Sequence, residues 1–217
     1  MCGGFALHDY VRDDLVDLFA DLDYEPTYNI RPTMQSPVVR MKDGQRIGEV
    51  MQFGMVPVWA KDIKISYKMF NARSETLFEK PAWKRPAKSK RCLIPANGFF
   101  EWEKREEGKY PFYITDKKTT PMLFAGVYDH WTDKSTGEVL MSYAIITTTP
   151  NKEMKTLHDR MPVILDASEE DGWLSEDDEG FLKSILNPLK DNSLHLAEVS
   201  QAVNTARGQG SEMIEPI

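Results

Sequence analysis

The sequence predicts a single α+β domain over residues 1–217, in which short helices flank a curled, largely antiparallel, barrel-like sheet. Short runs of β-type residues recur along the chain, and turn pairs such as Asp43-Gly44, Glu107-Gly108 and Thr136-Gly137 separate them. Hairpins and short helical patterns are interspersed. This arrangement indicates α+β architecture and not a doubly wound parallel sheet.

The individual elements follow from hydrophobic spacing. Leu15, Leu18, Phe19 and Leu22 have helical spacing, so a helix is expected over 13–22, with Pro26 ending it. Strands are expected at 36–41, 46–53, 91–101, 111–115, 123–128 and 140–147. Further short helices are expected at 74–79, 152–157, 169–174 and 178–186. No internal repeat or low-complexity linker interrupts this series, so one domain is expected.

Composition excludes several classes of protein. Hydrophobic residues make up 41% of the chain, and no apolar run approaches the roughly 18 residues that span a bilayer, so we expect no membrane association. Early charges at Arg12 and Asp13 argue against a secretory signal. Cys92 lies in an apolar stretch and is interpreted as a buried thiol in a reducing cytoplasm. Neither it nor Cys2 has metal-ligand spacing, so no metal or other cofactor is predicted.

Charge is unevenly distributed along the chain. The net charge of −7 argues against nonspecific nucleic-acid binding by an evenly charged surface. However, residues 80–91 carry six basic residues and no acid, whereas residues 166–180 carry eight acids and no base. The basic run is compatible with a small basic face on an otherwise acidic protein. The acidic run is typical of a solvated surface.

Cys2 is the most informative residue. Removal of Met1 would leave a chain that begins with a cysteine, whose thiol and α-amine share one carbon framework. Thiols titrate near about 8.5 and α-amines near about 7.7, so both nucleophiles are partly available near neutral pH. Such a 1,2-aminothiol closes a five-membered ring on an aldehyde, or acts as a thiol nucleophile with its own amine as base. The alternative is a disordered terminus with an incidental thiol.

Three further segments carry candidate functional groups. Asn71 and Arg73 precede a predicted helix start, where free N–H groups suit a phosphate or polar ligand, although Ser74 or Asn71 can equally cap that helix. Glu101 alternates with aromatic residues in a predicted strand, so it faces the side opposite Phe100 and Trp102, where desolvation would raise its pKa for proton transfer. An edge strand would instead leave it in solvent.

The last of these segments contains His158, next to Asp159. Histidine exchanges protons near pH 7, and Asp159 is placed to orient the ring. The other histidines lie among ordinary polar or helical neighbours and are interpreted as structural or surface residues. By residue type alone, His158 is the best general acid or base among them.

Taken together, four motifs in order resemble the signature of the SRAP family, the SOS-response-associated peptidase-like proteins that crosslink to abasic sites in single-stranded DNA. The motifs are Met1-Cys2-Gly3, the run 71–76 (NARSET), the run 97–102 (NGFFEW) and the run 158–162 (HDRMP). The resemblance extends from Cys2 to the segment 200–204. It implies the SRAP fold and a single-stranded DNA partner that contains abasic sites, with the replication machinery as a possible further partner. A monomer is expected by default for a protein that must accept a continuous strand.

The resemblance also implies roles for individual residues. Cys2 would form a thiazolidine with the abasic aldehyde after self-catalysed removal of Met1. Removal of Met1 would be a hydrolase and protease activity, and a lyase-like activity is a further possibility that the resemblance implies. Asn71 would position the terminus and the sugar, Glu101 would act as acid and base and assist Met1 removal, and His158 would help open the sugar ring. By the same resemblance, Arg73 and Arg160 would contact phosphates. The strand path would be lined by Asn29, Pro32, Trp59 and Thr147.

One position departs from the family pattern. Family members usually carry an arginine after Met-Cys-Gly as a phosphate contact, whereas this chain has Gly4. Losing one phosphate contact flattens the salt dependence of binding by about 0.7 in log-log slope for a single strand. We expect either Arg31 or the 80–91 cluster to supply the missing charge, and a Gly4→Arg substitution to raise affinity unless another group already fills that role.

Two other functions remain open from the residues. A glutamine amidotransferase also uses an N-terminal cysteine, which would attack the glutamine amide and leave Glu101 and His158 without roles. A noncovalent module for single-stranded DNA would use Arg73, Arg160 and Trp59, and its binding would survive Cys2→Ala.

Overall fold

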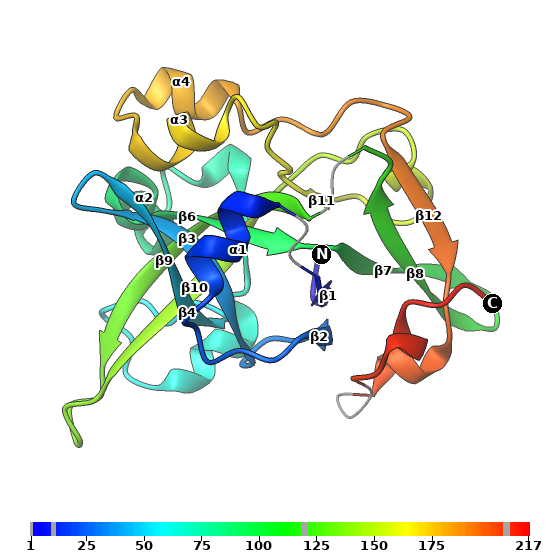
Figure 1. The fold of residues 1–217 in the computed structure, drawn as a ribbon, viewed down its shortest axis with the longest axis horizontal. Helices are drawn as coiled ribbons and strands as arrows, with labels where there is room; N and C mark the ends of the chain where they lie inside the picture. The colour runs from blue at the N-terminus through cyan, green and yellow to red at the C-terminus, as the bar shows by residue number, and fades with distance from the viewer. Residues whose placement is uncertain (1, 10–11, 119–120, 206–208) are drawn as a thin grey trace.

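A computed structural model describes residues 2–9, 12–118, 121–205 and 209–217 of the chain. Two sheets form its framework, one curled into a barrel and one open (Figure 1). In Figure 1 the barrel strands lie on the left, β7, β8 and β12 lie on the right, and β1 lies between them near the N-terminus. The predicted α+β class with a barrel-like sheet is confirmed.

Five strands close the barrel. They are β3 (Gln35–Lys42), β4 (Gln45–Phe53), β6 (Arg91–Ala96), β9 (Met122–Thr132) and β10 (Val139–Thr148). Because β9 pairs with both β6 and β10, the order β9–β10–β4–β3–β6 returns to β9. All of these pairs are antiparallel except β4 with β10, which is parallel. Two short strands, β5 (Asn71–Arg73) and β11 (Met161–Pro162), extend the sheet at the end of β10.

The open sheet is antiparallel throughout. Its order is β12 (Leu194–Glu198), β8 (Gly108–Asp116), β7 (Gly98–Arg105), β1 (Phe5–Leu7) and β2 (Thr27–Ile30). The predicted strand over 91–101 is therefore wrong in one respect, because β6 belongs to the barrel and β7 to the open sheet. The chain changes sheets at Asn97.

Side-chain hydrogen bonds from Asn97 explain the break. Its Oδ1 accepts from the backbone N–H of His8 at 2.8 Å, and its Nδ2 donates to the carbonyl of Asp9 at 3.0 Å. Gly98 follows, and a Cβ there would lie 2.2 Å from the ring of Tyr113. Asn97 thus fastens the segment that precedes α1, while Gly98 lets β7 approach β8 closely.

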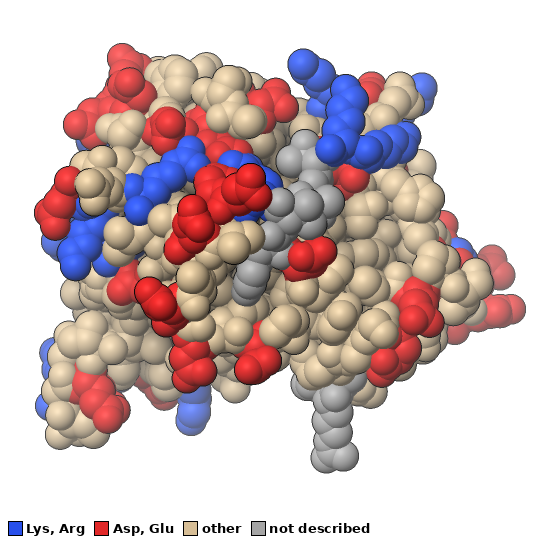
Figure 2. Space-filling model, viewed as in Figure 1, with Lys and Arg blue, Asp and Glu red and all other residues tan. Residues whose placement is uncertain are grey.

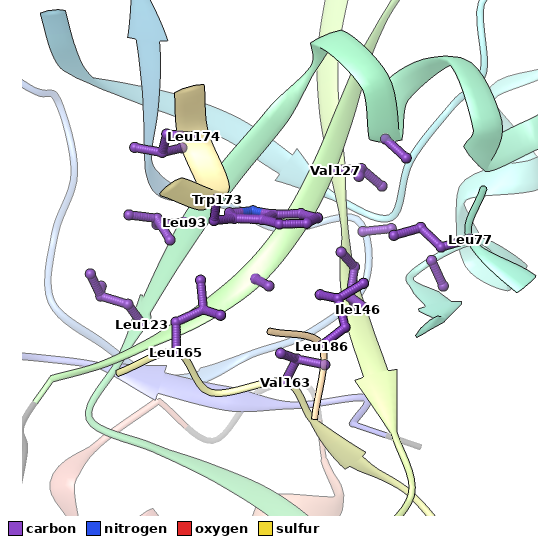
Figure 3. Packing of buried hydrophobic residues seen from close by; sticks show 14 of the residues in the cluster. Leu77, Leu93, Leu123, Val127, Ile146, Val163, Leu165, Trp173, Leu174 and Leu186 are labelled. Carbon is purple, nitrogen blue, oxygen red and sulfur yellow. The ribbon is translucent and has the colours of Figure 1, made fainter. Parts of the chain in front are cut away.

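Short helices cover the outside of the barrel. They are α1 (Asp13–Phe19), α2 (Pro81–Ser89), α3 (Glu170–Ser175) and α4 (Glu179–Ser184). Buried residues of all four join a cluster with alternate residues of β3, β6, β9 and β10. Figure 3 shows the indole of Trp173 at its centre, near Leu93, Val127 and Leu77. The indole N–H of Trp173 donates to the carbonyl of Cys92, which fixes α3 to the barrel.

Several helix predictions need correction. The first helix ends at Phe19 and not at residue 22, and the helices expected at 74–79 and 152–157 are single 3-10 turns at Ser74–Thr76 and Met154–Thr156. Isolated short helices are marginal, so tertiary packing decides how far each extends. The sequence patterns do not predict α2, which is rich in lysine and proline. Trp83 and Ala87 nevertheless give it a buried face, and Pro81 occupies its first turn.

The acidic segment 166–180 is not uniformly solvated. In Figure 2, acidic side chains gather over the part of this face where Figure 1 shows α3 and α4, with basic side chains close by. Glu170 of α3 is buried and accepts hydrogen bonds from Arg12 at 2.7 Å and from Arg46 at 3.2 Å. These ion pairs join α3 to the start of α1 and to β4. This part of the acidic run is therefore built into the tertiary structure, and removing either partner of these pairs would leave an uncompensated buried charge.

The other set of alternate barrel residues forms the interior. Val38, Phe53, Ile94, Phe124 and Tyr143 pack there, one from each of the five barrel strands. The cluster continues to the open sheet through residues of β1 and β7 and also includes Cys2, Met154 and Met161. Cys2 is thus part of the core and not of a loose terminus. None of the helices in the described part of the chain is both long and apolar enough to cross a membrane.

Candidate functional site

The pairing of β1 with β7 brings the start of the chain to Glu101. Phe5 lies opposite Phe99 and Ala6 opposite Gly98, and the backbone N–H of Phe100 donates to the carbonyl of Gly4 at 2.9 Å. Continuing this antiparallel register places Gly3 opposite Glu101. Two residues far apart in sequence, Cys2 and Glu101, are thereby brought together.

Cys2 lies fully buried at this meeting point. Its Sγ donates a weak hydrogen bond to the carbonyl of Gly4 at 3.7 Å. Burial, and secondarily the charge of Glu101, raises the pKa of the Cys2 thiol to about 12. The thiol is therefore protonated at neutral pH in this state, and a nucleophilic reaction requires a base to remove its proton.

Glu101 is only 2% exposed. Phe100 and Trp102 pack with the cluster on the other face of β7, so the predicted orientation of Glu101 is confirmed. Burial raises the pKa of the Glu101 carboxyl, and the nearby His158 opposes this shift. A desolvated carboxyl beside a protonated thiol has the properties of a proton acceptor for that thiol.

His158 lies between the 3-10 turn Met154–Thr156 and β11. Its Nδ1 is 3.0 Å from the backbone nitrogen of Arg160 and also 3.0 Å from Oδ1 of Asp159. The neutral ring accepts from the Arg160 N–H, whereas the protonated ring donates to Asp159. Because Nδ1 has a partner in both protonation states, the ring suits proton transfer.

A hollow of about 450 Å³ opens between these groups. Glu101 and His158 lie on its wall, together with three basic side chains. Its full lining consists of Arg31, Glu101, Trp102, Lys104, Lys109, His158 and Asn204. The hollow therefore combines proton-transfer groups with positive charge, as an anionic substrate would require.

Asn71 begins β5 and is held against β10. It pairs with Ile145 in the parallel β5–β10 ladder, and its Nδ2 donates to the carbonyl of Phe70 at 2.9 Å. Its Oδ1 is buried and has no hydrogen-bond partner among the described residues. An amide oxygen in this state is an available acceptor for a ligand or a terminal amine.

The predicted phosphate contacts differ in exposure. Arg73 is exposed at the end of β5. Arg160 is buried, pairs with Glu75 at 2.5 Å and also donates to the carbonyl of Thr147 at 2.5 Å. Thr147 is itself fully buried, and its hydroxyl lies 3.4 Å from the carbonyl of Ala72. Arg160 therefore organises this end of β10 in the structure, and Arg73 is the more accessible cation.

Asn29 and Pro32 lie at the end of β2 and just after it. Asn29 is buried, and its Nδ2 donates to the carbonyls of Val203 and Thr205 at 3.2 and 3.3 Å. Pro32 is half-buried and directly follows Arg31. Asn29 thus anchors the 3-10 turn Gln201–Asn204 beside the hollow.

Trp59 does not lie in this hollow. It is 57% exposed and lines a second hollow with Trp131, whose indole N–H donates to the carbonyl of Ala60 at 2.8 Å. Trp131 pairs with Leu140, whereas Thr147 lies seven residues further along β10, about 23 Å at the usual strand rise. Trp59 therefore lies near the Leu140 end of β10, whereas Thr147 lies at the other end.

Sequence reasoning did not assign the β7–β8 hairpin to the site. Lys104 and Lys109 face each other across this hairpin, and Trp102 precedes them on the same wall of the hollow. The turn pair Glu107-Gly108 was the available signal, since a hairpin around it brings the flanking lysines together. No group of three or more histidine, cysteine or acidic side chains in the described chain is arranged to hold a metal ion.

Comparison with known proteins identifies the family of this chain. The family described as "SOS response associated peptidase (SRAP)" matches residues 1–206, and the chain belongs to this family. The chain is similar to the abasic site processing protein YoaM of Bacillus subtilis, with 40% identity over 99% of this chain and 98% of that protein. It is also 34% identical to the abasic site processing protein HMCES of Xenopus tropicalis, over 89% of this chain and 67% of that protein.

Solved structures show the same fold. A protein from Bacteroides thetaiotaomicron superposes with a TM-score of 0.86 at 25% identity, covering 100% of both chains. A phage-related protein from Bordetella bronchiseptica superposes with a TM-score of 0.71 at 26% identity, covering 92% of this chain and 95% of that one.

Proposed function

We propose that this protein acts on abasic sites in single-stranded DNA and captures them covalently through Cys2. The observation that carries the proposal is the β1–β7 register, which sets the N-terminal cysteine beside a buried glutamate and a hollow that also contains His158. Family membership and the names of the relatives, which are abasic site processing proteins, support the same activity. Capture would shield the lesion during replication.

Met1 lies outside the described residues, and its removal is part of the proposal. Water would cleave the Met1–Cys2 peptide bond, and the α-amine of Cys2 would then be free. Glu101, desolvated and next to Cys2, is the group placed to activate that water. No further protease activity is required.

The capture reaction has two bond-forming steps. The Cys2 amine adds to the aldehyde carbon of the opened abasic sugar, and the carbinolamine loses water to give a Schiff base. The Cys2 sulfur then adds to the same carbon, a base removes the thiol proton, and the imine nitrogen takes up a proton to become the ring amine. The product is a five-membered thiazolidine, and one water is released overall.

The properties of the site support the following proton transfers. Burial raises the pKa of the Cys2 thiol, which supports loss of its proton as the sulfur attacks, with Glu101 as the acceptor. His158 lines the same hollow, where it is suited to protonate the ring oxygen as the sugar opens and the hydroxyl as water leaves. The Asn71 Oδ1 is an acceptor suited to orient the amine.

Intact mass spectrometry tests the proposal directly. Protein that begins at Cys2 is incubated with a single-stranded oligonucleotide carrying one abasic site. The expected product has the summed mass of the two less one water. The Cys2→Ala variant should give no such product, while Cys92→Ala, whose thiol is also fully buried, serves as the matched control and should react normally.

Other outcomes identify the alternatives. Binding that survives Cys2→Ala without any mass shift would indicate a noncovalent module for single-stranded DNA. A transient adduct with a glutamine analogue, and none with DNA, would indicate an amidotransferase. Either result would contradict the proposal.

A further inference from the structure

The guanidinium of Arg31 lies directly over Gly4. A Cβ built on Gly4 would be 3.2 Å from Nη1 of Arg31 and 3.3 Å from both its Cζ and Nε. These distances are tighter than ordinary van der Waals contact. A side chain at position 4 would therefore force the guanidinium to shift by a few tenths of an ångström. Arg31 also lines the hollow that contains Glu101 and His158. A cation thus lies beside the reacting groups.

The contacts of Arg31 fix its position without neutralising its charge. The guanidinium stacks over the Trp102 ring at 5.0 Å and donates to the carbonyls of Gly3 and Val203. No carboxylate of the described residues lies within ion-pair distance of it. By contrast, a carboxylate pairs with each of Arg12, Arg40, Arg46, Arg105 and Arg160. Arg31 therefore keeps its charge for a ligand.

The 80–91 cluster does not offer an equivalent cation at the site. Lys90 pairs with Asp129 at 2.5 Å, and Arg91 is buried and donates to the carbonyls of Ala87 and Trp173. The helix that carries the cluster, α2, packs on the outer face of the barrel through Trp83 and Ala87. Of the two expected sources of charge, only Arg31 lies at the hollow.

We propose that Arg31 binds a phosphate adjacent to the abasic sugar, and that Gly4 serves this function by leaving the space in which the guanidinium lies. This inference rests on the proposed function. It fits the chemistry of the ligand, since a planar guanidinium offers paired donors to phosphate oxygens. Stacking on Trp102 holds the Arg31 guanidinium in place before DNA binds. Less conformational entropy is therefore lost when the guanidinium contacts a phosphate.

The inference is tested by removing charge from the DNA and from the protein in turn. The probe is a single-stranded oligonucleotide with a tetrahydrofuran abasic analogue, which has no aldehyde and cannot crosslink. Its two flanking linkages are replaced, one at a time, by neutral methylphosphonate. Affinity is measured by fluorescence anisotropy for the wild type and for Arg31→Ala at several salt concentrations.

One neutral linkage should weaken binding to the wild type by about 10- to 100-fold, the range for a hydrogen-bonded charge pair. The same change should leave Arg31→Ala unaffected, and this variant should show a log-log salt slope smaller by about 0.7. Equal losses in both proteins, or no loss in either, would overturn the inference. Because the probe cannot crosslink, these results are independent of whether the covalent reaction occurs.

Gly4→Ala provides a second test that keeps Arg31. The added methyl group should shift the guanidinium by a few tenths of an ångström and cause part of the loss seen in Arg31→Ala, whereas adding Gly4→Ala to Arg31→Ala should cost nothing further. Additive losses would contradict the inference. Thermal unfolding of each variant confirms that it is folded, and Arg31→Lys, which retains the charge without the planar fork, should show an intermediate affinity.

Discussion

Arg160 and Glu75 form a two-point ion pair, with nitrogen–oxygen distances of 2.5 and 2.9 Å. The pair joins the segment that contains Asn71 to the segment that contains His158, although 85 residues separate the partners. Arg160 also donates to the carbonyl of Thr147 on the strand between them. One guanidinium thus links the segments that carry two predicted catalytic residues, in addition to the pairing of β5 and β11 with β10.

Glu75→Gln should lower the free energy of unfolding by about 1 kcal/mol at pH 7, since Glu75 is half-exposed and solvent screens the pair. The hydrogen bond from Arg160 lowers the pKa of Glu75 below its ordinary 4.5. The contribution of the pair is therefore complete above pH 4.5 and is lost as the pH falls through the lower pKa of the folded state. Urea unfolding at pH 7 and at about pH 3 should show the difference between wild type and variant shrinking; a constant difference would exclude this linkage.

Glu101→Gln should affect activity and stability in opposite directions. Loss of the proton acceptor should slow crosslinking by about 10²- to 10⁴-fold in protein that begins at Cys2. Burial raises the Glu101 pKa, so the wild type loses stability as pH rises above 4.5 through the folded-state pKa. The variant lacks this loss and should melt at a higher temperature than the wild type at pH 7, with the gap closing below pH 4.5. A variant with unchanged rate would remove Glu101 from the mechanism.

Gly98→Ala should destabilise the fold by about 1–3 kcal/mol, because the new methyl group meets the Tyr113 ring. Denaturant midpoints measure this loss. The matched test is the double variant Gly98→Ala/Tyr113→Val, in which the shortened side chain should remove most of the clash. If the double variant loses the sum of the two single effects, the contact with Tyr113 is not the cause.

Trp59→Ala should weaken the binding of long single strands but not of short ones. Trp59 lines the second hollow with Trp131, whose partner Leu140 lies about 23 Å along β10 from Thr147. A short oligonucleotide centred on the abasic site should therefore crosslink at the wild-type rate. Longer strands that reach the second hollow should lose about 1–3 kcal/mol of binding, the value of stacking one base. Anisotropy over a series of lengths measures this. Trp131→Phe, a change in the same hollow that keeps an aromatic ring, is the control. A large loss on the shortest strand would place Trp59 nearer the lesion.

Much of the fold was predictable because strand patterns are local. Alternating residues and glycine turns predicted β3, β4, β8, β9 and β10 closely. The split between β6 and β7 was not predictable, because it depends on hydrogen bonds that Asn97 accepts from residues 89 and 88 positions away. Helix α2 was missed for a similar reason, since its stability comes from Trp83 and Ala87 packing on the barrel and not from its composition.

The sequence by itself determined the candidate chemistry: an N-terminal cysteine, a glutamate alternating with aromatic residues and a histidine, in motifs whose order identifies the family. Only the tertiary structure decided that Cys2 is buried beside Glu101, that Arg160 is paired with Glu75, and that Arg31 lies over Gly4. The physical reason is that residue type is fixed locally, whereas burial, charge pairing and the space beside a glycine depend on strand register and on packing between distant segments.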